Sequence, residues 1–114
     1  MQYRELTEIG LLDEIDTKSS EKNGGVVIFK HSTRCAISHM VWSRFKRSWN
    51  WPESELPLYM LDLIRFREVS NEIARRYNVQ HESPQLLLIK NARCIYNTSH
   101  NDIHPSNLEG IVND

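Results

Sequence analysis

The chain has 114 residues, of which 39% are hydrophobic and 25% are charged, and its formal net charge is −1 at pH 7. A chain of this length and composition can bury one hydrophobic core, which argues against a disordered protein and predicts one domain over residues 1–114. The balanced charge argues against a nucleic-acid partner. No apolar run approaches the roughly 20 residues of a membrane span, and residues 1–5 do not resemble a signal peptide. We therefore expect a cytoplasmic protein with no membrane partner.

The first half of the chain predicts a helix, a strand and a second helix. Apolar residues recur at three-residue intervals in the segment 4–16, which predicts the first helix. The pair Gly24-Gly25 ends that pattern, and the continuous apolar segment 26–29 then predicts a buried central strand. Helical spacing resumes afterwards, so we expect a second helix that starts at or just before Cys35 and stops at Trp51-Pro52.

The second half predicts a strand, a helix, a hairpin and a closing helix. The apolar segment 56–64 predicts a strand parallel to the first, because a helix connects the two. Amphipathic spacing over 66–77 predicts the third helix, and the segments 85–89 and 93–97, joined by a short turn, predict an antiparallel hairpin. A last helix is expected to begin at Pro105, since proline suits a first helical turn.

The predicted order of elements is therefore α-β-α-β-α-β-β-α, without internal repeats. A parallel strand-helix-strand unit followed by a helix and a hairpin is the arrangement of the thioredoxin fold. We expect an α/β protein with a thioredoxin-like fold, in which helices flank a central mixed sheet of about four strands. Other small α/β folds share parts of this order.

Cys35 is the candidate catalytic residue. It follows the central strand and lies at the predicted start of the second helix, where unsatisfied amides and the helix dipole stabilise a thiolate, and the adjacent Arg34 adds a cation. A thiolate is the nucleophile in thiol-disulfide exchange. The alternative is an inert cysteine that fills space at a helix start, because free cysteines are often buried.

Ser38 decides which thiol chemistry the motif permits. The segment 35–38 has the spacing of the redox motif Cys-x-x-Cys, but Ser38 occupies the position of the second, resolving cysteine. A hydroxyl cannot close a disulfide. The motif therefore predicts monothiol chemistry, in which Cys35 takes a small thiol from a mixed disulfide and stays capped until another thiol releases it.

The dipeptide Ser83-Pro84 is the second feature of the predicted site. It immediately precedes the strand 85–89, where thioredoxin folds place a cis-proline whose loop faces the active cysteine. We expect a cis bond close to Cys35, with its backbone groups presented to the substrate. The alternative is an ordinary trans proline at the start of a strand, because cis bonds are a minority among X-Pro bonds.

Three segments, 31–38, 61–65 and 81–85, resemble the monothiol bacilliredoxin family of thioredoxin-like bacterial proteins linked to bacillithiol. The family motif reads Thr-Cys-Pro-Ile, whereas this chain has Arg34 inserted next to the cysteine and Ala36 in place of the proline. The resemblance implies that Cys35 exchanges bacillithiol with oxidised protein thiols, so that the partners are S-thiolated client proteins and a low-molecular-weight thiol. Bacillithiol is then a co-substrate, and no bound cofactor is expected. The candidate substrate-binding or supporting residues are Thr33, Arg34, Ser38, Ser83 and Pro84.

Two other functions remain open at this point. A non-catalytic thioredoxin-like module would bind a partner through the Pro84 loop and the aromatic second helix. An enzyme of the arsenate-reductase-like type also uses a cysteine at a helix start, but it would need an arginine-rich anion site, and the sequence shows only Arg34 beside Cys35.

The histidines and the second cysteine are weaker candidates. His39 lies one helical turn after Cys35, where it could support the thiolate, although an exposed histidine without a role is the simpler interpretation. A zinc site can be built from Cys35, His39, His100 and His104, but such spacing is common, and we predict no metal. Cys94 reads as a half-buried strand residue.

The segment 44–51 mixes three cations with aromatic residues. Such a segment could stack nucleic-acid bases, but a helix with a solvated basic face is the simpler interpretation in a chain without net positive charge. Trp42, Trp49 and Trp51 are expected to pack at the edge of the core; an exposed cluster would instead mark a partner surface.

Overall fold

One mixed sheet of five strands, in the order β1-β3-β2-β4-β5, runs through a computed structural model that describes residues 2–112. Met1 and residues 113–114 of the predicted domain lie outside that range. The strands are β1 (Arg4–Glu5), β2 (Val26–His31), β3 (Leu58–Asp62), β4 (Gln85–Lys90) and β5 (Arg93–Ser99). The first three are parallel, whereas β4 is antiparallel to β2 and β5 is antiparallel to β4. The sheet thus has one strand more than the sequence predicts.

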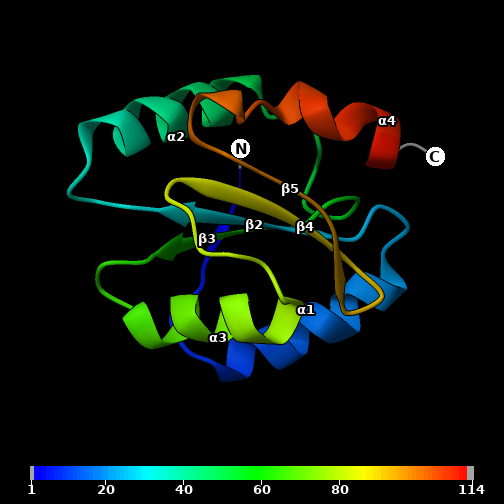
Figure 1. Ribbon diagram of the computed structural model, residues 1–114. Coiled ribbons are helices and arrows are strands. Elements are labelled where there is room, and N and C mark those ends of the chain that lie inside the picture. The colour runs from blue at the N-terminus through cyan, green and yellow to red at the C-terminus, as the bar shows by residue number, and fades with distance from the viewer. Residues whose placement is uncertain (1, 113–114) are drawn as a thin grey trace.

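Helices cover both faces of this sheet. Figure 1 shows α1 (Gly10–Glu21) and α3 (Arg67–Tyr77) on one face, and α2 (Ala36–Ser48) on the other. The closing segment shares the face of α2; it consists of the 3-10 turns η1 (His100–Asp102) and η2 (Pro105–Leu108) and the short helix α4 (Glu109–Val112). Within residues 2–112, no helix is both long and apolar enough to cross a membrane.

The central strand β2 divides the buried side chains into two clusters. Because side chains alternate along a strand, Val26 and Ile28 join the cluster under α1 and α3, whereas Val27 and Phe29 join the cluster under α2. A strand that is buried on both faces needs an unbroken apolar run, which is the pattern that predicts β2 from the sequence.

The predicted first helix, 4–16, is wrong in its first half. Residues Arg4 and Glu5 pair with Tyr59 and Met60 of β3, and the Leu6 amide donates to the Met60 carbonyl at 2.9 Å. The helix begins only at Gly10 and continues to Glu21. Leu6 is fully buried, as its place in the apolar pattern predicts. Its backbone amide, however, is hydrogen-bonded to the edge of a distant strand and not within a helix.

The remaining elements follow the prediction with shifted ends. The second helix stops at Ser48, before Trp51-Pro52, and the second predicted strand, 56–64, is reduced to Leu58–Asp62. The predicted closing helix is split into η2 and α4. The hairpin turn at Asn91 and Ala92 has positive φ values of 52° and 62°, as a tight two-residue turn between antiparallel strands requires.

Three loops meet at one end of the sheet. The connections from β2 to α2 and from β3 to α3 lie at the left end in Figure 1, and the connection from α3 to β4 runs back to that end, where β4 begins; the β4–β5 turn lies at the opposite end. The pairing agrees with this view, since His31 pairs with Asp62 and Lys30 pairs with Gln85. In open α/β sheets such an end, beyond the parallel strands, is where ligands bind.

Candidate active site

Cys35 is the N-cap residue of α2, as the sequence predicts. Its backbone is extended, with φ −111° and ψ 120°, and its amide donates to the Ser32 carbonyl at 3.1 Å, which closes the turn after β2. Its own carbonyl accepts the His39 amide at 3.1 Å, the first hydrogen bond of the helix. The Cys35 side chain is only half-buried and forms no disulfide. The sulfur therefore combines a helix N-terminus with access from solvent, the surroundings in which cysteines are reactive.

Ser38 is fully buried one turn into α2, and its hydroxyl is held by two partners. The Ser32 amide donates to Ser38 Oγ at 2.9 Å, and Ser38 Oγ lies 2.7 Å from His31 Nδ1. Burial is the main cause that lowers the pKa of His31 to about 4, and the charge of His39 adds to it. His31 is then neutral at pH 7, and its Nδ1 shares a hydrogen bond with the Ser38 hydroxyl whose direction the ring tautomer sets. At the position of a resolving thiol, the chain has a hydroxyl that fastens the cysteine loop to β2.

His39 is exposed, as expected, but it is not without a partner. Its Nε2 lies 2.8 Å from the Thr33 carbonyl, so Nε2–H donates to the loop that leads into Cys35. Its ring also packs edge-on against the His31 ring, with centroids 4.7 Å apart. His39 therefore braces the cysteine loop from the helix side.

Asp62, at the end of β3, connects the cysteine loop to the neighbouring loop. Its Oδ1 accepts from Thr33 Oγ1 and from the amides of Ile64 and Arg65, each at 3.2 Å. Sequence reasoning did not single out Asp62 or His31 as site residues. His31 and Asp62 each end an apolar strand, and polar residues at such positions meet at the carboxyl end of a parallel sheet. That position was the signal by which the sequence could have revealed them.

The Ser83–Pro84 bond is cis, as the sequence predicts. Pro84 lies one residue beyond the paired residues Lys30 and Gln85, level with the end of β2 from which the Cys35 loop departs. The Pro84 carbonyl accepts the amide of His100 at 3.0 Å, and His100 has a positive φ of 57°. The sequence raised His100 only as part of a candidate zinc site, and its place beside Pro84 comes from the fold.

Cys94 lies far from Cys35. It pairs with Ile89, which in turn pairs with Val26 at the start of β2, whereas Cys35 follows the end of that strand. Six residues of strand separate these levels by about 16 Å, and disulfide-bonded Cα atoms lie within about 7 Å. Cys94 packs against the cluster under α1 and α3, and burial raises the pKa of its thiol. The prediction of a half-buried strand residue is confirmed.

The aromatic residues of the segment 44–51 and the neighbouring Trp42 serve the core. Trp42 is buried against Phe29, with ring centroids 4.7 Å apart, and Trp49 and Trp51 pack on the same cluster. The predicted packing role is confirmed. The Arg44 Nη2 donates to the carbonyls of Asn101 and Ile103, each at 3.1 Å, which ties α2 to the closing segment.

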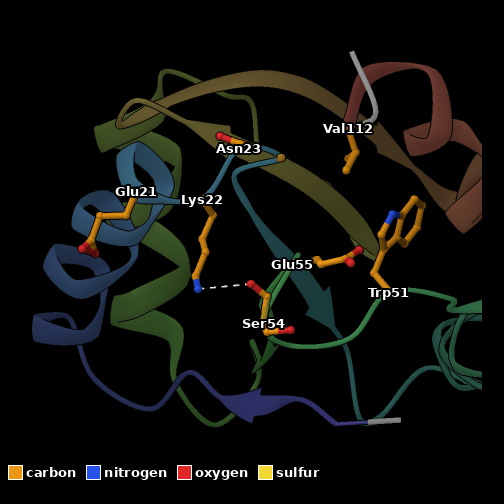
Figure 2. A pocket seen from close by; sticks show the side chains of 8 residues that line it. Glu21, Lys22, Asn23, Trp51, Ser54, Glu55 and Val112 are labelled. Carbon is orange, nitrogen blue, oxygen red and sulfur yellow. Dashed lines mark hydrogen bonds between the residues drawn. The ribbon is translucent and has the colours of Figure 1, made fainter.

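A hollow of about 500 Å³ lies at the opposite end of the sheet, at the start of β2. Figure 2 shows Glu21, Lys22 and Asn23 on one side of it, and Trp51, Glu55 and Val112 on the other. The Lys22 ammonium donates across the hollow to the Ser54 carbonyl at 3.1 Å. Because Cys35 follows the other end of β2, this hollow does not serve the thiol. Within residues 2–112, no three His, Cys, Asp or Glu side chains are grouped closely enough to hold a metal ion.

Comparisons with known proteins agree with this geometry. The family model described as "Monothiol bacilliredoxin BrxC" matches residues 4–108. A solved structure of a candidate oxidoreductase with a thioredoxin fold is 30% identical, with a TM-score of 0.76 over 96% of this chain and 92% of that chain. The thioredoxin of Malassezia sympodialis is 17% identical, with a TM-score of 0.73 over 98% and 89%, and that of Schistosoma mansoni is 20% identical, with a TM-score of 0.66 over 99% and 97%. The predicted thioredoxin-like fold is confirmed.

Proposed function

This chain belongs to the monothiol bacilliredoxin family, and from that premise we propose that it is a thiol-disulfide oxidoreductase that removes bacillithiol from mixed disulfides of client proteins. The observation that carries the proposal is the half-exposed Cys35 at the N-terminus of α2, combined with a serine at position 38. The first gives a nucleophile, and the second leaves it without a resolving thiol on the same helix.

The first step moves the small thiol from the client to the enzyme. The Cys35 thiolate attacks the bacillithiol sulfur of the mixed disulfide; a new S–S bond forms, and the bond between bacillithiol and the client breaks. The client sulfur leaves as a thiolate and takes a proton from water. The client is thereby reduced, and Cys35 is oxidised to a mixed disulfide with bacillithiol.

The second step needs an external thiol. Ser38 Oγ is hydrogen-bonded to His31 and to the Ser32 amide, and an oxygen cannot attack to form a disulfide. Cys94 is too distant to reach Cys35 within this fold. The thiolate of a second thiol, such as free bacillithiol, attacks the bacillithiol sulfur of the mixed disulfide. A new S–S bond forms between the two small thiols, the bond to Cys35 breaks, and Cys35 leaves as a thiolate. One external thiol is consumed for each client thiol that is released, so the proposed cycle requires no bound cofactor.

The surface around Cys35 supports the approach of a protein client. Ile37 and Met40, on the outer side of α2, are 52% and 55% exposed, and the Ser83–Pro84 segment lies at the same end of the sheet. We propose that Thr33 and Arg34 shape the loop that presents the sulfur, and that Ser83 and Pro84 face the client backbone. Thr33 is fixed for this by its bond to Asp62.

Intact-mass spectrometry tests the proposal. The reduced protein is incubated with oxidised bacillithiol, and we expect one bacillithiol adduct on the wild type and on Cys94→Ser but none on Cys35→Ser. A client carrying a bacillithiol mixed disulfide should then lose it to the wild type and to Cys94→Ser only. The matched variants isolate Cys35, because each removes one of the two cysteines of the chain.

Equal labelling of both cysteines, or an equal loss of exchange in both variants, would contradict a single nucleophile. The rate of alkylation by iodoacetamide at neutral pH separates catalysis from simple binding, since a catalytic Cys35 should react much faster than a free model thiol. If Cys35 reacts no faster, a non-catalytic thioredoxin-like module becomes the better interpretation.

A further inference from the structure

Lys30 is a fully buried cation in the central strand. Its neighbours on the same face of β2, Val26 and Ile28, belong to the apolar cluster under α1 and α3. Within residues 2–112 no carboxylate is in ion-pair contact with the Lys30 ammonium. A buried charge without an opposite charge lowers stability, and an apolar side chain of similar length would avoid that cost. A lysine at this position therefore indicates a role other than packing.

The partners of Lys30 lie on the segment that carries Pro84. Its Nζ is 2.6 Å from His81 Nδ1 and donates to Gln85 Oε1 at 3.2 Å. The Gln85 side chain is buried as well, and it binds the same segment twice: its Nε2 donates to the Gln80 carbonyl at 3.0 Å, and its Oε1 accepts the Glu82 amide at 3.3 Å. Lys30 and Gln85 thus fasten residues 80–85 to the central strand from inside the protein.

We propose that Lys30 is a positioning residue for thiol exchange, which holds the 80–85 segment, and with it Ser83 and Pro84, in place for the disulfide that Cys35 attacks. The inference rests on the proposed function and adds to it a residue that does not touch the substrate. Lys30 precedes Cys35 by five residues, near the end of the strand that leads into the cysteine loop. One buried side chain thus connects the strand that carries Cys35 with the 80–85 segment.

The charges around Lys30 agree with this role. Burial lowers the pKa of Lys30 to about 8, the nearby Glu82 acts against that shift and Arg67 adds to it, so the ammonium remains mostly charged at neutral pH. Burial also lowers the pKa of His81, and the positive charges of Lys30 and Arg67 lower it further. His81 is then neutral, and its Nδ1 can accept a hydrogen bond from the Lys30 ammonium.

The test compares Lys30→Met with the wild type in two reactions of Cys35. Alkylation by iodoacetamide needs only the thiolate, whereas exchange with a bacillithiol-client mixed disulfide also needs the positioned segment. We expect alkylation within twofold of the wild type and exchange slower by about tenfold, mainly through a higher KM, since misplacing a substrate-binding group has effects of this size or larger. Thermal stability should be equal or higher, because methionine fills the site without a charge.

Lys90→Met is the matched control. Lys90 is the last residue of β4, and its Nζ donates to the Lys22 carbonyl at 2.7 Å at the far end of the sheet. Its replacement should leave both reactions unchanged. His81→Ala provides a second variant whose side chain lies at the surface, and it should also slow exchange without slowing alkylation.

Exchange at the wild-type rate in both Lys30→Met and His81→Ala, or an equal loss of alkylation and exchange, would overturn the positioning role. If Lys30→Met does not fold, His81→Ala decides by the same two reactions. Failure of the proposed function gives a different result: the wild type itself would not exchange. In that case NMR titration of His81 still tests the contact, since its pKa should rise toward the ordinary value in Lys30→Met and stay low if Lys30 does not contact it.

Discussion

At the scale of single residues, the site is organised around a hydroxyl where a dithiol protein has a second sulfur. Ser38 Oγ joins the Ser32 amide to His31 Nδ1, so the neighbours His31 and Ser32 and the more distant Ser38 form one buried unit. Replacing the sulfur removes the resolving step and at the same time gives the cysteine loop a fixed anchor. The same serine therefore accounts for the missing second thiol on α2 and for the hydrogen bonds that hold the loop.

His31 makes stability depend on pH. The side chain is 3% exposed and its pKa is lowered to about 4 from 6.5, so between these values the unfolded chain binds a proton that the folded protein does not. Stability is complete above pH 6.5 and falls as the pH drops toward 4, by up to about 3 kcal/mol for this residue. Urea unfolding at pH 7, 5.5 and 4.5 should show this loss.

His31→Gln is the control for that prediction. It cannot titrate in this range, so its stability should fall less between pH 7 and 4.5 than that of the wild type, whatever its stability at pH 7. Identical slopes in the two proteins would show that protonation of His31 does not limit the fold.

At the scale of secondary-structure elements, α2 performs two tasks on two sides. Its inner side places Val41, Trp42 and Phe45 in the core, and its outer side carries the exposed Ile37 and Met40. The packing of the inner side fixes the helix axis, and the axis in turn fixes where the N-cap sulfur lies. The position of the Cys35 sulfur thus depends on side chains two and three turns away from it.

Truncation on the two sides of α2 should have very different effects on folding. Phe45→Ala removes a fully buried ring that packs on Phe29 at 5.1 Å between centroids, and should cost about 3–5 kcal/mol of unfolding free energy. Ile37→Ala changes an exposed side chain and should stay within about 0.5 kcal/mol. Chemical denaturation measures both, and a similar loss in the two variants would contradict the described orientation of α2.

At the scale of the whole molecule, the sheet keeps the two thiols apart. Cys35 follows the carboxyl end of β2, whereas Cys94 lies level with its amino end and faces the cluster under α1 and α3. An internal disulfide would need the sheet to come apart. We therefore expect this chain, which has two cysteines, to exchange disulfides through one of them.

Turnover should depend on an external thiol. Once capped at Cys35, the wild type should release the small thiol at a rate that rises with the concentration of added thiol and with its thiolate fraction. Ser38→Cys introduces a sulfur one helical turn from Cys35 and should weaken that dependence. Stopped assays with mass analysis of the capped protein measure both rates.

Cys94→Ser is the control here, and it should keep the full dependence on added thiol. Spontaneous release by the wild type, independent of added thiol and accompanied by a Cys35–Cys94 disulfide in the mass spectrum, would show that the fold opens far more readily than its geometry implies.

The sequence by itself determined the features that depend on local pattern. The apolar run of β2, the helix start at Cys35, the serine at position 38, the hairpin and the position of Pro84 all follow from periodicity, turn chemistry or motif spacing within a short window. Such features can be predicted from neighbouring residues, because helices and strands each require apolar side chains at a characteristic spacing along the chain.

Only the tertiary structure decided the features that depend on contacts between distant segments. Arg4 and Glu5 lie next to apolar residues with helical spacing, but they pair with β3, more than 50 residues later. Nothing in the sequence around Lys30 indicates that its partner is His81. The hydrogen bonds from Thr33 to Asp62 and from His100 to Pro84 likewise cannot be predicted from neighbouring residues. The physical reason is that burial and hydrogen-bond partners across a sheet are set by strand order and register, which no short segment contains.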